Sequence, residues 1–88
     1  MDIYEEAINR YGIQHQSIVA IEELSELIKE ITKACRNLAN QDHMAEEIAD
    51  VIIMINQLII MYGINREDID LFIQYKIHRL EKMLGETE

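Results

Sequence analysis

Two clusters of carboxylates are the residues of this chain whose types and spacing could do chemistry. The first is Glu22-Glu23-Leu24-Ser25-Glu26 and the second is Glu46-Glu47-Ile48-Ala49-Asp50. Residues three or four apart share a helix face, so Glu23 points with Glu26, and Glu47 points with Asp50. Like charges at this spacing destabilise a helix by about 0.2–0.5 kcal/mol per pair. A cation held between the two clusters would remove that repulsion.

The position of these acids relative to the apolar residues separates two interpretations. On the predicted helix 42–62, Glu47 falls inside the apolar stripe, and this segment has no lysine or arginine to pair with it. A carboxylate at a core-facing position is costly without a partner. A solvated acidic face is enough to explain Glu22 and Glu46. The matched set with the core-facing member indicates a metal site, made by Glu23, Glu26, Glu47 and Asp50.

Carboxylate oxygens are hard ligands, which predicts Mg²⁺, with Mn²⁺ as a substitute, rather than zinc. Magnesium is usually shared between a few carboxylates and the phosphates of a substrate, and it can activate a water molecule for attack. The formal net charge of -9 argues against binding to nucleic acid or to an anionic membrane surface. A phosphate-bearing ligand would therefore need a bound cation.

Two basic residues near the end of the chain could add positive charge to such a site. In the predicted helix 66–84, Lys76 lies within the apolar stripe and Arg79 lies beside it. Both could steady phosphate oxygens. Alternatively, the stem of Lys76 packs while its head reaches water, or the lysine pairs with Glu47.

The apolar periodicity predicts an all-α chain forming one domain, residues 1–88, with no strands. Gly12 and Gly63 each follow a tyrosine and are plausible helix-ending glycines. Asn65 is a good N-cap for the last helix, and Asn40 or Asp42 for the one before it. The expected helices are about 2–11, 14–37, 42–62 and 66–84.

The apolar stripes predict which faces are buried. On helix 14–37 the stripe expected to face the core is Ile21, Leu24, Leu27, Ile28 and Ile31. Helix 42–62 has a wide stripe, formed by Met44, Ile48, Val51, Ile55, Leu58 and Ile59, and it carries Ile53 and Ile60 on nearly the opposite side. A helix that is apolar on both sides is buried on both sides. The sequence thus predicts a four-helix antiparallel bundle-like subunit whose core is completed by oligomerisation, although Ile53 and Ile60 could instead rest on the first helix.

Cysteine content and termini predict a location. Cys35 is the only cysteine, which suits a reducing compartment, and the first residues are acidic where a signal peptide needs basic ones. The longest apolar region, 51–61, is interrupted by Asn56 and Gln57 and is too short to span a bilayer. We expect a cytoplasmic protein.

The paired acidic motif resembles the MazG-type signature EExxE, spacer, ExxD, and the apolar segment 51–54 and the Lys76–Leu80 segment are also similar to that family. The resemblance implies an all-α nucleoside triphosphate pyrophosphohydrolase that is a homodimer or homotetramer. It implies Glu23, Glu26, Glu47 and Asp50 as the Mg²⁺ ligands, and Glu22 as a further ligand or as a group that supports the ligands from behind. One of the carboxylates, with Glu22, Glu23 and Glu26 as the candidates, would orient the attacking water. Gln16 would approach the nucleotide, although a glutamine near a helix start can equally be solvated.

Two other interpretations remain open. The acidic helices are comparable to those of phosphoribosyl-ATP pyrophosphatase, although the segment 51–54 does not look like its counterpart there. The chain could also be a helical dimerisation or regulatory module without catalytic activity.

Overall fold

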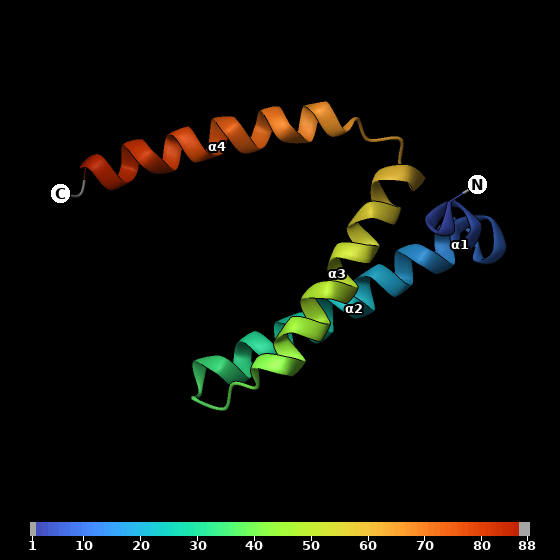
Figure 1. The fold of residues 1–88 in the computed structure, drawn as a ribbon, viewed down its shortest axis with the longest axis horizontal. Coiled ribbons are helices and arrows are strands. Elements are labelled where there is room, and N and C mark those ends of the chain that lie inside the picture. Colours follow the sequence, from blue (N-terminus) through green and yellow to red (C-terminus); the bar gives the residue numbers. More distant parts are fainter. Residues whose placement is uncertain (1, 87–88) are drawn as a thin grey trace.

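The computed structural model describes residues 2–86 and consists of four α-helices joined by short turns, as the periodicity predicts (Figure 1). Each boundary lies within two residues of its predicted place, and the described residues form no strand. No helix in this part of the chain has the length and apolar character needed to cross a membrane. The helices are α1 (Ile3–Tyr11), α2 (Ile13–Cys35), α3 (Gln41–Met61) and α4 (Arg66–Glu86).

Side-chain caps start the two later helices. The Asn40 side chain accepts a hydrogen bond from the His43 backbone N–H (3.1 Å), which makes Asn40 and not Asp42 the N-cap of α3. The Asn65 side chain accepts from the Glu67 N–H (2.8 Å), as expected for the start of α4. Each cap satisfies a donor that the first helical turn leaves unpaired.

A residue in the left-handed backbone conformation follows the end of α2 and of α3. Gly63 has φ 62° after α3, and Asn37 has the same φ after α2. The Ile64 N–H then donates to the Ile59 carbonyl (3.0 Å), the long-range bond of a Schellman motif. Gly12, with φ 90°, ends α1 and leads directly into α2. Both predicted helix-ending glycines are confirmed.

The α2–α3 hairpin is the packed centre of the molecule. Its buried apolar residues are small or flexible: Ala20, Val51 and Met54. Two buried amides fix the register of the helices, because the Gln16 Nε2 donates to the Gln57 Oε1 across the hairpin (2.7 Å). On α2, the less exposed residues recur every three or four positions along the side that packs on α3, as in a coiled coil: Gln16, Ala20, Glu23, Leu27, Glu30 and Ala34.

The two remaining helices, α1 and α4, differ in how they pack on the hairpin. Helix α1 packs against both α2 and α3 at the open end of the hairpin, whereas α4 leaves the end of α3 and projects away (Figure 1). Among the described residues, α4 packs extensively against no other helix and contains no buried residue. The expected four-helix bundle is therefore not completed within one chain, because the apolar side of α4 finds no partner there.

The predicted core stripe of α2 is largely on the outside of the single chain. Ile21 and Ile28 are each 62% exposed, and Leu24 and Ile31 are also exposed, which corrects the expectation that this stripe faces the core of the single chain. The stripe lies about a quarter turn away from the side that contacts α3. Ile48, Ile52 and Ile55 of α3 are likewise exposed. By helical geometry the two exposed stripes lie on the same side of the hairpin.

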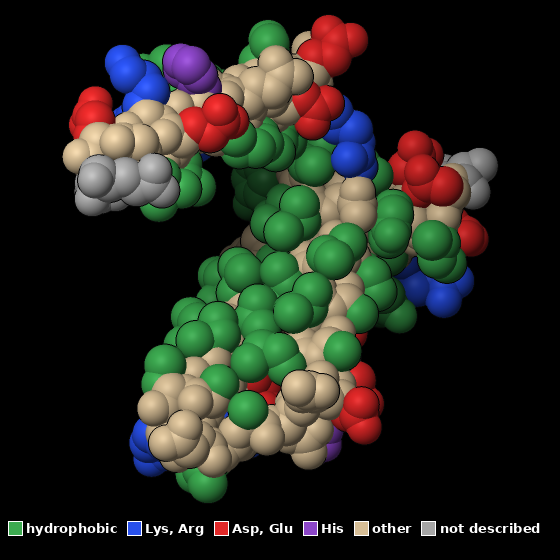
Figure 2. Space-filling view, turned by 60° about the vertical axis from the view of Figure 1, so that its left-hand side comes forward, with side chains coloured by type: hydrophobic (Ala, Val, Ile, Leu, Met, Phe, Trp, Pro, Cys, Tyr) green, Lys and Arg blue, Asp and Glu red, His purple; other side chains and the backbone are tan. Residues whose placement is uncertain are grey.

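We call these seven exposed residues the apolar face of the hairpin. Figure 2 shows hydrophobic side chains running continuously over the hairpin, with more on the side of α4 that is turned toward it. Monomeric proteins rarely expose contiguous apolar patches of more than a few hundred Å². Among the described residues, no helix covers this face in one chain.

The left-handed turn after α3 can be tested by substitution. Gly63→Ala should destabilise the protein by about 1–2 kcal/mol, because a Cβ at positive φ is strained. Gly85→Ala is the matched control: Gly85 lies within α4, so alanine there should be neutral or stabilising by up to about 1 kcal/mol. Urea unfolding measures both. Equal effects of the two substitutions would contradict the assigned turn.

Candidate metal centre

Three carboxylates from the two helices of the hairpin come together. Glu23 of α2 and Glu47 and Asp50 of α3 each offer an oxygen atom, and these three atoms all lie within 4.8 Å of one another. The register that pairs Gln16 with Gln57 also places Glu23 opposite Asp50, because both partners are displaced by seven residues. The coiled-coil packing of α2 on α3 thus brings the acids together.

The electrostatics of this group are unfavourable in the absence of a cation. Glu23 and Glu47 are half-buried, and the pKa of each is raised, first by loss of hydration and then by the neighbouring Asp50 carboxylate. The Oε2 atom of Glu47 is buried and has no hydrogen-bond partner among the described residues. Burying such an oxygen unpaired costs free energy.

A divalent cation fits this arrangement. Magnesium binds oxygen at about 2.0–2.1 Å, so neighbouring ligands in an octahedron lie about 3 Å apart and opposite ligands about 4.2 Å apart. Oxygens already within 4.8 Å need only small side-chain rotations to reach those separations. The buried, unpaired Glu47 Oε2 is the atom that such an ion would satisfy.

The other two predicted acids lie outside this group. Glu26 is half exposed, and its Oε1 pairs with the Lys29 Nζ at 3.3 Å. It still borders the site, because its charge helps to raise the pKa of both Glu23 and Glu47. Glu22 is exposed on α2. Of the four predicted ligands, the structure therefore brings three together and places the fourth beside them.

Gln16 is buried rather than solvated. Besides its bond to Gln57, its Oε1 lies 2.8 Å from the Nδ1 of His15, whose ring stacks on Tyr11. The amide therefore ties α2 to α3 in this structure. Its contact with a nucleotide stays a prediction.

Lys76 and Arg79 are separated from the acidic group within one chain. Both are exposed on α4, and this helix does not pack along α2 or α3. The ion pair between Lys76 and Glu47 that the sequence left open is therefore not formed in the described structure.

Sequence reasoning missed a further inward acid, Glu30. It is only 8% exposed and lies on the side of α2 that packs on α3. The signal was its spacing, since Gln16, Glu23 and Glu30 follow one another at intervals of seven residues. The more apolar stripe of α2, from Ile21 to Ile31, predicts a different side of this helix as the packed one.

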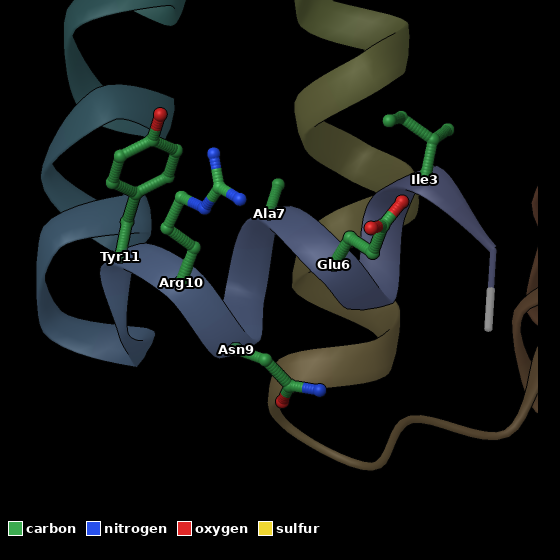
Figure 3. A pocket seen from close by; sticks show the side chains of 6 residues that line it. All are labelled: Ile3, Glu6, Ala7, Asn9, Arg10 and Tyr11. Atoms are coloured by element: carbon green, nitrogen blue, oxygen red, sulfur yellow. The ribbon is translucent and has the colours of Figure 1, made fainter.

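A shallow hollow lies elsewhere on the surface, along α1 (Figure 3). Glu6, Arg10 and Tyr11 are among the residues that line it, and all of its lining comes from this one helix. It contains none of the clustered acids, so it is not part of the candidate metal centre.

Comparison with known proteins adds no relative: the chain matches no family model, and neither a curated protein nor a solved structure is detectably similar to it. The function of the site therefore has to be argued from its own chemistry.

The raised pKa values predict how Glu47 affects stability in the metal-free protein. When the pKa of a carboxyl group is higher in the folded protein than its ordinary value of 4.5, the group stabilises the fold at pH values below 4.5. This contribution is lost as the pH rises through the pKa of the folded state. Glu47→Gln should therefore raise Tm at neutral pH, and the gain should shrink as pH falls toward 4.5. Thermal melts in a chelator across this pH range measure the effect.

Glu46→Gln is the control, because Glu46 is an exposed neighbour on the same helix. It should change Tm much less. Saturating Mg²⁺ should raise Tm of the wild-type protein more than that of Glu47→Gln, since a ligand bound only to the folded state adds about 2.7 kcal/mol at a hundredfold excess over its Kd. A loss of stability in Glu47→Gln at neutral pH without metal would show that the acids are compensated in some other way.

Proposed function

We propose that this chain is a Mg²⁺-dependent nucleoside triphosphate pyrophosphohydrolase, converting a nucleoside triphosphate and water into a monophosphate and pyrophosphate. The observation that supports this most directly is the convergence of Glu23, Glu47 and Asp50, with one buried oxygen left unpaired. The resemblance of the same residues to the MazG-type motif supports the choice of substrate.

The acids of the hairpin determine how a triphosphate can approach. Glu23, Glu47 and Asp50 would repel phosphate oxygens directly, so a bound cation would be needed between these carboxylates and the substrate. When bound, Mg²⁺ lowers the pKa of a coordinated water and neutralises charge on the phosphates. Mn²⁺ satisfies the same oxygen ligands.

The reaction requires a base close to the phosphorus. The water oxygen bonds to the α-phosphorus, the bond from that phosphorus to the α–β bridging oxygen breaks, and pyrophosphate leaves with the electron pair. The proton of the water passes to a carboxylate. Glu26 is the better placed of the remaining candidates, because its charge acts on both Glu23 and Glu47, whereas Glu22 is not among the charges that act on them.

We further propose that the working protein is a homodimer or homotetramer. Over residues 2–86 of one chain, the apolar face of the hairpin and the apolar side of α4 both lack a partner, and the buried apolar core is small. A second copy supplies matching apolar surfaces, because each chain carries both. Such an assembly offers a route for Lys76 and Arg79 of one chain to the acidic site of another.

A non-catalytic dimerisation module is the second candidate, and the exposed apolar face favours it. It differs from the enzyme in requiring no chemistry at the acidic group. Phosphoribosyl-ATP pyrophosphatase activity is a variant of the enzyme interpretation, and it differs only in substrate.

Pyrophosphate release tests the enzyme proposal. With Mg²⁺ and a panel of nucleoside triphosphates, deoxynucleoside triphosphates and phosphoribosyl-ATP, the wild-type protein should release pyrophosphate. Glu47→Gln should lower kcat/KM by at least about a hundredfold, because it removes a ligand of the ion that stabilises the transition state. Glu46→Gln should keep most of the activity.

The outcomes separate the three candidates. Hydrolysis of phosphoribosyl-ATP alone would replace the proposed substrate. Absence of pyrophosphate from every nucleotide, with the protein still an oligomer, would favour the non-catalytic module.

The mass of the protein in solution tests the oligomer. Ultracentrifugation should give two or four chains for the wild-type protein. Ile28→Glu combined with Ile52→Glu should weaken assembly by at least about a hundredfold in Kd, because two charges would be buried in an apolar contact. Ile3→Glu, which is 71% exposed on α1 and outside the apolar face, is the control and should leave the mass unchanged. A monomeric wild-type protein would refute the assembly.

A further inference from the structure

A chain of hydrogen bonds runs through two buried amides at the open end of the hairpin. Gln16 of α2 is 6% exposed and Gln57 of α3 is 5% exposed. The Gln16 Oε1 accepts from the His15 Nδ1 (2.8 Å), because a carboxamide oxygen can only accept. The Gln16 Nε2 donates to the Gln57 Oε1 (2.7 Å), and the Gln57 Nε2 donates to the Met54 Sδ (3.7 Å). All four polar atoms of the two amides therefore have a partner.

These amides lie on the less apolar of the two sides with which α2 could pack. The stripe of α2 from Ile21 to Ile31 stays exposed, about a quarter turn from the side that contacts α3. Rolling α2 by that quarter turn would bury more apolar surface. It would also separate Gln16 from Gln57 and leave both amides without their bond, which is costly. The amide pair thus opposes burial of the stripe.

The acids of the candidate metal centre depend on the same orientation of α2. Glu23 lies two helical turns from Gln16 along α2, and Asp50 lies two turns from Gln57 along α3. A quarter-turn roll of α2 would turn Glu23 away from Asp50. The clustered carboxylates lie between two places where the helices are joined, the amide pair at one end and the turn of the hairpin at the other.

We propose that the Gln16–Gln57 pair is the positioning element of the metal centre, holding α2 with its acidic side on α3. The pair is no ligand of the ion and acts only through the placement of Glu23. Because the fold has already brought the repelling carboxylates together, an ion does not have to gather them as it binds. This inference rests on the proposed function for its role, since the ion is the one that the proposed reaction uses.

The affinity for Mn²⁺ without nucleotide, measured by electron paramagnetic resonance of the free ion, tests the positioning role. Gln16→Leu and Gln57→Leu should each lower Tm, because each leaves the other amide buried without its partner. The double variant should regain the lost Tm, since both unpaired amides are then gone. It should nevertheless bind Mn²⁺ at least about tenfold more weakly than the wild-type protein. In a double-mutant cycle, each single substitution should weaken Mn²⁺ binding about as much as both together.

Tyr62→Phe is the matched control. The Tyr62 hydroxyl lies 2.7 Å from the Ser17 Oγ, so this variant removes an exposed hydrogen bond between the residue beside Gln16 and the end of α3. It should leave the Mn²⁺ affinity unchanged. Gln57→Asn tests the same pair without adding an apolar group. It keeps the amide but shortens the side chain by one methylene group, and it should also weaken Mn²⁺ binding.

The outcomes separate this inference from the proposed function. Wild-type Mn²⁺ affinity in the double variant and in Gln57→Asn would overturn the positioning role and leave the enzyme standing, and so would an equal loss of affinity in Tyr62→Phe. Weaker Mn²⁺ binding by the double variant, with no pyrophosphate released by the wild-type protein from any nucleotide, would support the positioning role and refute the enzyme. A wild-type protein that binds no Mn²⁺ would refute both.

Discussion

The placement of carboxylates inside the contact between α2 and α3 is the constraint on which the rest of this structure depends. Helices pack through residues that recur every three or four positions, and those positions are normally apolar. Here Glu23 and Glu30 occupy them on α2, and Glu47 occupies one on α3. The hairpin therefore gives up part of its hydrophobic stabilisation to hold negative charge in a half-buried place. That arrangement is reasonable if a cation is bound there.

Small residues make the arrangement possible. Ala20 and Val51 are among the most buried residues of the hairpin, and short side chains let two helix backbones approach closely. Close approach is what brings carboxylates of different helices to within 4.8 Å. The buried Gln16–Gln57 pair fixes the register of α2 against α3, because a shift of either helix would leave both amides unpaired. The same contact thus sets the geometry of the acids and limits how much apolar surface the hairpin can bury.

The large apolar residues that are absent from this contact are found on the outside. Isoleucines of α2 and α3 form the apolar face of the hairpin, and α4 extends with its own apolar side uncovered (Figure 2). A chain of 88 residues buries a smaller fraction of its surface on folding than a larger domain does. Within one chain, the contact between α2 and α3 thus contains polar groups, while large apolar side chains of both helices stay exposed.

The sequence by itself determined the four helices, the Asn65 cap, the helix-ending glycines Gly12 and Gly63, and the candidate acids Glu23, Glu47 and Asp50. These features depend on local chemistry: the 3.6-residue period, asparagine and glycine at helix ends, and the fixed spacing of acids along a helix.

The sequence did not determine which side of α2 packs on α3, since the stripe Ile21–Ile31 is more apolar than the side that makes the contact. Only the tertiary structure decided that, and with it the burial of Gln16 and Glu30, the position of Glu26 beside the group and the separation of Lys76 from it. The physical reason is that α2 has two sides able to pack on another helix. Which of them packs depends on the fit of the two backbones and on the register of the facing residues, and not on apolar content alone.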